Sequence, residues 1–244
     1  APLLFSSRRL PRTPIELDFD DFGSSGETFI TGMGDLTLNN VIIQADTNGS
    51  QPAGNVTIDS PGQVTFINSQ INSNANHQGR AGDIEIIADR LLLEDDSRIN
   101  ATTLSSDGGN VTLILGDLLL LRHGSAISTT AGTAGAGGNG GNIVIVLADG
   151  VVAAIPSENN DITANAFDGK GGNIQITAGG IVGLQFRPEL TPLSDITASS
   201  EIGLDGVVQL DTPELEPNQG LVELPVELID PSNQISTSCL VAAD

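Results

Sequence analysis

One short phrase recurs along the chain and restricts the folds that are open to it. A glycine is followed by a polar residue and then by an apolar-x-apolar run, as in Gly141-Asn142-Ile143-Val144-Ile145. The copies begin at Gly54, Gly82, Gly109, Gly141, Gly172 and Gly206, so the steps between them are 28, 27, 32, 31 and 34 residues. A period of roughly 30 residues is typical of solenoid proteins, in which similar coils stack on one another.

Two further runs follow each copy in step. The second phrase has the pattern Ser-x-Ile-Ser, with variants such as Asn160-Asp161-Ile162-Thr163. The other run is apolar, as in Val64-Thr65-Phe66, and lies between the first phrase and the second. All three runs are rich in Val, Ile and Leu and alternate over three to five residues, which is a strand period. We therefore expect three short strands and three turns in each period.

A single coil of this kind cannot bury its apolar side alone, so the coils must stack and share a core. The sequence predicts an all-β parallel β-helix of about six coils, with strands about 4.8 Å apart along the stack. The central isoleucines of the second phrase form the expected core ladder: Ile71, Ile99, Ile127, Ile162 and Ile196. The first phrase supplies a second inward set: Val56, Ile58, Ile84, Ile86, Val111, Leu113, Ile143, Ile145, Ile174 and Ile176.

The start of the first phrase predicts a special turn. We expect the repeated glycine to adopt positive φ, a region that asparagine also tolerates. The polar residues that follow it can stack as an amide ladder along the axis: Asn55, Asn110, Asn142 and Asn173. We expect Asp83 to interrupt this ladder and Val207 to end it.

The repeats divide the chain into three parts. Residues 1–24 are expected to be a poorly ordered lead-in, 25–210 the β-helix, and 211–244 an acidic, proline-spaced cap or tail. Within the β-helix, Phe29 to Gln44 is interpreted as an incomplete coil because no Gly-Asn phrase precedes it. The loops at 154–160 and 185–194 lengthen the later coils, and such insertions often mark the binding face of a solenoid.

Composition excludes several classes of partner. The chain carries 31 acidic and nine basic residues, a formal charge of −22, whereas nucleic acids and anionic membranes need a basic patch. Cys239 is the single cysteine, so no intrachain disulfide is expected. No apolar run approaches the 18 or so residues of a spanning helix, so membrane insertion is not expected.

Candidate chemistry is sparse. Gly137 to Asn142 is similar to a calcium-binding nonapeptide but occurs once, which favours a flexible turn. His77 and His123 stand at different points of the coil and predict no metal site. Acidic residues gather near the loops, where they could serve a polysaccharide-cleaving enzyme: Asp95, Asp96, Glu158, Asp161, Glu189 and Asp195. Asp161 and Asp195 fall at the same place in consecutive coils, so we expect them one rung apart. The repeat alone would place two residues at equivalent positions, so the pair does not require a catalytic role. We predict no catalytic residue and no cofactor.

Several phrases resemble the filamentous haemagglutinin-like exoproteins of cyanobacteria, most specifically from about residue 150 to 235. The residues that carry the resemblance include Asn160 to Phe167, Gly183-Leu184-Gln185-Phe186-Arg187-Pro188, Leu193 to Ser200, and Gly220-Leu221-Val222-Glu223-Leu224-Pro225. The resemblance implies a right-handed β-helix on a secreted or outer-surface protein that a partner pore in the outer membrane exports. The N-terminal secretion domain of that family is not among these residues, which is expected of the C-terminal portion of a longer exoprotein.

The sequence therefore predicts a non-enzymatic adhesin or stalk module, secreted or held on the outer face of the outer membrane. Its expected partners are the outer-membrane transporter and surface glycans or other cells. Two alternatives stay open: a β-helical lyase or hydrolase that acts on polysaccharides, and a calcium-stabilised surface-layer module.

Overall fold

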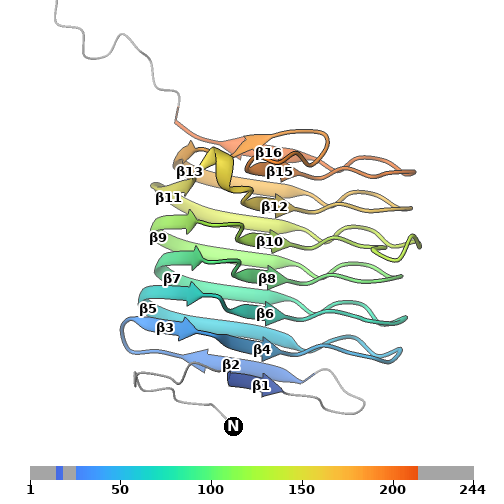
Figure 1. Ribbon diagram of the computed structural model, residues 1–244, viewed down its shortest axis with the longest axis horizontal. Coiled ribbons are helices and arrows are strands. Elements are labelled where there is room, and N and C mark those ends of the chain that lie inside the picture. Colours follow the sequence, from blue (N-terminus) through green and yellow to red (C-terminus); the bar gives the residue numbers. More distant parts are fainter. Residues whose placement is uncertain (1–14, 19–25, 214–244) are drawn as a thin grey trace, which may run out of the picture. The chain divides into compact units, whose positions relative to one another are not determined.

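A computed structural model of the chain describes residues 15–18 and 26–213 (Figure 1). Apart from one 3-10 turn, Pro156–Glu158, the regular elements of this part are β-strands in two parallel sheets. The long-strand sheet contains β2 (Glu27–Thr31), β3 (Leu36–Asn39), β5 (Asn55–Ile67), β7 (Ile84–Glu94), β9 (Val111–Leu121), β11 (Ile143–Ala154), β13 (Ile174–Val182) and β16 (Val208–Asp211). The short-strand sheet contains β1 (Ile15–Asp18), β4 (Val41–Gln44), β6 (Gln70–Asn72), β8 (Arg98–Asn100), β10 (Ala126–Ser128), β12 (Asp161–Thr163), β15 (Asp195–Thr197) and β14 (Gln185–Phe186).

The strands pair coil upon coil, as the ordered colours of Figure 1 show, so the predicted parallel β-helix of about six turns is confirmed. The division of each coil differs from the expectation. In β5, β7, β9 and β11 the first and third apolar runs join into one bent strand of 11 to 13 residues. The pairing register shifts at the bend, for example between Ser60 and Gln63, because extra residues take the strand round the corner.

The core consists of continuous apolar ladders. Ile71, Ile99, Ile127, Ile162 and Ile196 pair in register and are fully buried, as predicted. The second inward set, from Val56 to Ile176, is also buried. Burying each such side chain is worth roughly 1.5–3 kcal/mol, about twice the net value of a hydrogen bond, so the ladders dominate the stability of the stack.

The repeated glycines are required for a reason other than the expected one. None of the six repeat glycines has positive φ. Instead, a Cβ at Gly141 would collide with the carbonyl oxygen of Gly109, and one at Gly172 with that of Gly141. The coils approach each other so closely at this corner that a side chain has no room.

The amide ladder exists, and Asp83 belongs to it. Asn110 donates its backbone N–H and its Nδ2 to Asp83 Oδ1, at 2.8 and 3.0 Å, and Asp83 donates its backbone N–H to Asn55 Oδ1 at 2.8 Å. Asn142 and Asn173 extend the same pattern upward, each donating twice to the residue one coil below. The prediction that Asp83 interrupts the ladder is wrong, because a carboxylate oxygen accepts as well as an amide oxygen does.

Positive φ occurs at a different corner, just before the second phrase, at Asn40, Asn68, Asp95, Asp96, His123 and Asn159. The following residues form a second, buried row that runs the opposite way. Ser69 N–H donates to Ser97 Oγ at 3.1 Å, and Ser97 N–H donates to Ser125 Oγ at 3.2 Å. Asn160 and Ser194 continue the row through the later coils. The recurrent serine of the second phrase therefore satisfies a buried backbone donor of the coil below.

The first coil is complete, contrary to the expectation of a partial one. β2 pairs with β5 and aligns Glu27 with Asn55 and Ile30 with Ile58. The repeated phrase is obscured in this coil because Glu27 stands in place of asparagine and Thr28 in place of the first apolar residue. β1 lies within the expected lead-in and pairs with β4. Of the expected cap or tail, 211–244, the structure describes residues 211–213, and the remainder, with Cys239, lies outside the described residues.

Candidate functional site

An insertion in the last coil changes the outer face of the stack. After β13, Gly183 adopts positive φ of 81° and the chain enters β14, which pairs with β15 on the side away from β12. β14 thus occupies the place that a further coil would take in the short-strand sheet. The residues between β14 and β15 form what we term the cover loop, 187–194.

The cover loop lies over outward side chains that the early coils leave half-exposed. Asp195 and Thr197 in β15 are fully buried, whereas Gln70 and Asn72, at the same places in β6, are half-buried. The loop is held by Asp195, whose Oδ1 pairs with the Arg187 guanidinium. Its Oδ2 accepts from Thr191 twice, from the backbone N–H at 2.5 Å and from Oγ1 at 2.9 Å.

Asp161 stands directly below, so the predicted one-rung spacing of the two carboxylates is confirmed. Asp195 donates its backbone N–H to Asp161 Oδ1 at 3.0 Å. Burial raises the pKa of Asp161, the N–H of Asp195 opposes that rise, and the Asp195 charge adds to it. Because Asp195 is fully buried and its oxygens are engaged by the loop, it acts as an anchor of the loop and does not face solvent.

A groove of about 580 Å³ lies beside the cover loop. One wall is the loop itself, and the floor and the other wall are the turns that follow β10, β12 and β15. The lining residues are Thr130, Ala131, Gly132, Thr133, Asn165, Ala166, Phe167, Pro188, Glu189, Leu190, Ser199, Ser200, Glu201 and Asp205. Its volume is within the usual range for small-molecule sites, about 300–1,000 Å³.

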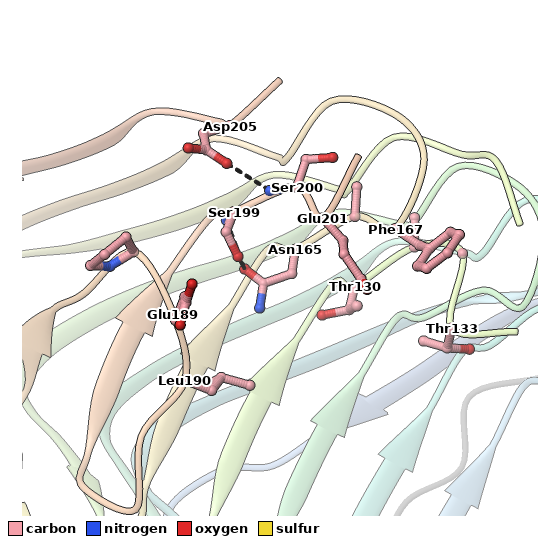
Figure 2. A pocket seen from close by; sticks show the side chains of 14 residues that line it. Thr130, Thr133, Asn165, Phe167, Glu189, Leu190, Ser199, Ser200, Glu201 and Asp205 are labelled. Carbon is pink, nitrogen blue, oxygen red and sulfur yellow. Dashed lines mark hydrogen bonds between the residues drawn. The ribbon is translucent and has the colours of Figure 1, made fainter. Parts of the chain in front are cut away.

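The floor of the groove carries polar side chains from three consecutive coils, as Figure 2 shows. Asn165 Oδ1 accepts from Ser199, from the backbone N–H at 2.9 Å and from Oγ at 3.2 Å. The Nδ2 of Asn165 makes no hydrogen bond among the described residues and is available to a ligand. Thr130 Oγ1 lies 3.3 Å from Thr163 Oγ1, in the next coil.

The two sides of the groove combine apolar and acidic groups. Figure 2 places Glu189 and Leu190 on one side of Asn165, and Phe167 and Thr133 on the other. Asp205 Oδ1 accepts from the backbone N–H of Ser200 at 2.8 Å and so fixes the turn after β15.

The sequence indicated only part of this site. Of the groove residues, Glu189 was among the acidic candidates, and the longer 185–194 loop was expected to make contacts. Glu201 and Asp205 were missed, although the longest step in the repeat, from Gly172 to Gly206, ends just beyond them.

The other long loop, 154–160, does not line the groove. Its Glu158 forms a two-pronged ion pair with Arg122, at 2.9 Å to Nε and 3.0 Å to an Nη atom, and accepts the His123 N–H at 2.9 Å. These contacts, led by the Arg122 side chain, lower the pKa of Glu158 to about 2. His123 also lies 3.0 Å from Asp95, while Asp96 is 3.9 Å from Arg98. Asp95 and Glu158 therefore serve contacts between coils, whereas the contact of Asp96 with Arg98 lies within one coil.

Metal-ligating side chains do not converge on a metal site in the part of the chain that the structure describes: no group of three or more His, Cys, Asp or Glu there is arranged so that it could hold a metal ion. The glycine-rich turn that is similar to a calcium nonapeptide has its asparagine oxygens engaged. Asn139 Oδ1 accepts from the backbone N–H of Lys170 at 2.9 Å, and Asn142 Oδ1 belongs to the amide ladder.

No family model, curated protein or solved structure matches the chain. Within residues 15–18 and 26–213 there is no helix of the length and apolarity needed to cross a membrane. The assignment of a function accordingly rests on the fold and on the groove.

Proposed function

We propose that the chain is a non-enzymatic β-helical adhesin module, secreted or displayed at the cell surface, which contacts glycans through the groove beside the cover loop. The observation that supports it most is the floor of the groove, where hydroxyl and amide groups from three coils line up beside Phe167 and Leu190. Sugar rings offer hydroxyls at their edges and C–H groups on their faces, and such a surface suits both.

The scaffold supports a passive, load-carrying role. Two corners of the coil are joined to the next coil by rows of hydrogen bonds, and the core ladders continue from coil to coil. The resemblance to filamentous haemagglutinin-like exoproteins adds the setting: export by an outer-membrane transporter, and exposure of the module outside the outer membrane.

An enzyme that cuts polysaccharides is the second candidate, because Glu189, Glu201 and Asp205 border the groove. A hydrolase of this kind needs two carboxylates that flank one glycosidic bond. Asp195 is excluded from that role by its burial and its contacts with Arg187 and Thr191.

A single experiment separates the two candidates. The purified protein is incubated with a panel of neutral, acidic and amino-sugar polysaccharides, and the mixtures are resolved by size-exclusion chromatography. The proposal expects one class of polymer to co-elute with the protein at unchanged length. Shortening of a polymer would make the module an enzyme, and failure of every polymer to co-elute would remove glycan binding from the proposal.

A matched pair of variants locates the contact. Leu190→Lys places a charge on the exposed apolar wall of the groove and is expected to abolish co-elution. Val146→Lys makes the same change on the outer face of the long-strand sheet, where the side chain is 39% exposed, and should leave co-elution intact. Equal behaviour of the two variants would contradict the location.

A further inference from the structure

The charge of the groove points to a narrower class of ligand. Its lining includes Glu189, Glu201 and Asp205 but no Lys, Arg or His. All three carboxylates are exposed, and none has an ion-pair partner among the described residues. Arg187, at the start of the cover loop, is already paired with Asp195 and also donates to Gln185 Oε1 at 2.8 Å. Lys170 bridges through its backbone to Leu204, next to Asp205, and is not among the residues that line the groove. The groove therefore repels polyanions and attracts cations.

We propose that the groove binds a cationic amino-sugar polymer, with glucosamine residues along the three-coil floor and their ammonium groups beside the carboxylates. This inference rests on the proposed function and specifies its ligand. It excludes sulfated and uronate polysaccharides from this groove, since their charges have the wrong sign.

The backbone of the groove favours a sugar over a basic peptide. A peptide that binds as an added strand needs free backbone donors and acceptors. Here the backbone N–H groups are used between coils: Ala131 donates to Asn165 at 2.9 Å, Ala166 to Ser199 at 2.9 Å and Glu201 to Ala166 at 3.1 Å. The Nδ2 of Asn165 remains as a donor for a ligand. The hydroxyls of Thr133, Ser199 and Ser200 donate within the chain and remain as acceptors, so the two kinds of group match the hydroxyls of a sugar.

A buried hydroxyl in β15, close to the groove, has no hydrogen-bond partner in the part of the chain that the structure describes. Thr197 Oγ1 is fully buried and has no hydrogen-bond partner among the described residues. Thr197 stands one rung above Thr163 and on the same outward face as Ser199, which lines the groove. Buried polar groups of this kind are rarely left without a partner. Thr197 is not among the residues that line the groove, so a ligand reaches its hydroxyl only if the cover loop shifts.

The spacing and the aromatic group agree with this ligand. Successive coils present their side chains about 4.8 Å apart, comparable with the length of one pyranose residue, so each coil can meet one sugar. Phe167 offers a ring face, which attracts both C–H groups and an ammonium group.

The test is isothermal titration calorimetry of the whole chain at low salt with three probes: a glucosamine hexamer, the N-acetylglucosamine hexamer, and hexalysine. The proposal expects the glucosamine hexamer to bind more tightly than the other two and to weaken as salt is added. Equal binding of the N-acetylated hexamer would show a glycan site indifferent to charge, which overturns the inference but keeps the proposed function. Equal binding of hexalysine would show that the charge of the ligand alone determines its affinity, which would overturn the inference. Failure of both sugars to bind would also overturn the inference, and the other polysaccharides of the panel would still test the proposed function.

Charge-matched variants complete the experiment. The double variant E189Q/E201Q is expected to weaken the glucosamine hexamer about tenfold, as removal of two solvent-exposed charge pairs would. The control D59N/D149N removes two exposed carboxylates that do not line the groove and should bind as the unaltered chain does. An unchanged affinity in E189Q/E201Q would contradict the proposed site.

Discussion

The second and third coils, residues 54–108, and the sixth coil, residues 172–205, are built on the same core but present different outer faces. Ile71, Ile99 and Ile196 occupy one continuous ladder and are equally buried. In the early coils the side chains outside this ladder are half-exposed and form stacked polar pairs, such as Asn100 Nδ2 to Asn72 Oδ1 at 2.9 Å. In the sixth coil the cover loop buries that face and encloses a groove at its edge.

The difference shows that the repeat specifies the scaffold and the departure from the repeat specifies the site. Stacked coils need the same apolar residues at the same places, whatever lies outside them. An insertion at one corner leaves these requirements unchanged, so a new surface can be added there without disturbing the core.

The largest expected effect comes from a charge in the shared core. Ile86→Asp in β7 and Ile145→Asp in β11 each place a carboxylate where the side chain is fully buried, which costs several kcal/mol and should prevent folding of the stack. The outward neighbours, Ile87→Asp and Val146→Asp, are the controls and should keep the β-sheet spectrum. Far-UV circular dichroism and urea unfolding check both pairs, and tolerance of either core variant would mean that the third and fifth coils do not share one core.

The next effect is confined to the sixth coil. Asp195→Asn leaves Arg187 without its partner and is expected to lower the free energy of unfolding by up to about 3 kcal/mol, and to open the cover loop. We expect faster proteolysis within 187–194, with residues 54–108 as resistant as before. If the loop stays protected, Asp195 is not its anchor.

Asp161→Asn is the matched control one rung below, and it should behave in the opposite way. The raised pKa of Asp161 means that the folded state holds this proton to a higher pH than the unfolded chain does, so ionisation lowers stability as pH rises. The amide removes that loss and still accepts the N–H of Asp195. The melting temperature at pH 7 should be unchanged or higher, and a marked fall would contradict the origin of the pKa shift.

A smaller effect tests the close approach of coils. Gly141→Ala forces the backbone of Gly109 to move, which should cost roughly 1–3 kcal/mol as overpacking does. Gly180→Ala meets nothing within 4 Å and should be neutral or slightly stabilising. Urea denaturation midpoints of the two variants give the comparison, and equal midpoints would show that the glycine column is not a packing requirement.

The smallest effect is the acid dependence of the link between the fourth and fifth coils. Glu158 has a pKa of about 2 in the folded state, below its ordinary value of 4.5, so its stabilising contribution is complete above the ordinary value. The contribution should disappear as the pH falls from 4.5 to 2. Melting temperatures recorded across this range should fall less steeply for Glu158→Gln, while Glu27→Gln, an exposed change in β2, should follow the unaltered chain.

The core could be predicted from the sequence because burial leaves a periodic signal. The Ile71 and Ile99 ladder follows from alternation alone, and the spacing of Asp161 and Asp195 follows from the repeat. The role of Gly141 and the place of Asp83 could not be derived as easily, because both depend on how closely two coils meet and which atom of one faces the other. Sequence spacing carries no record of that distance.

The groove could not be predicted from the sequence for a related reason. Glu201 and Asp205 become part of a site only because the chain turns back at Gly183 and pairs as β14, and a two-residue strand has no periodicity to detect. The first coil was difficult to identify for a similar reason. Thr28 is a polar residue at an apolar position of the repeat, and one such change is enough to obscure a short pattern.

β14 has a consequence for how proteins of this kind change their length. The sixth coil carries, within its own insertion, both the strand that ends the short-strand sheet and the wall of the groove. Duplication of a regular coil such as residues 54–81 would lengthen the stack and leave that terminal unit intact. Reach and recognition can then vary independently, the first by the number of coils and the second by the sequence of one loop.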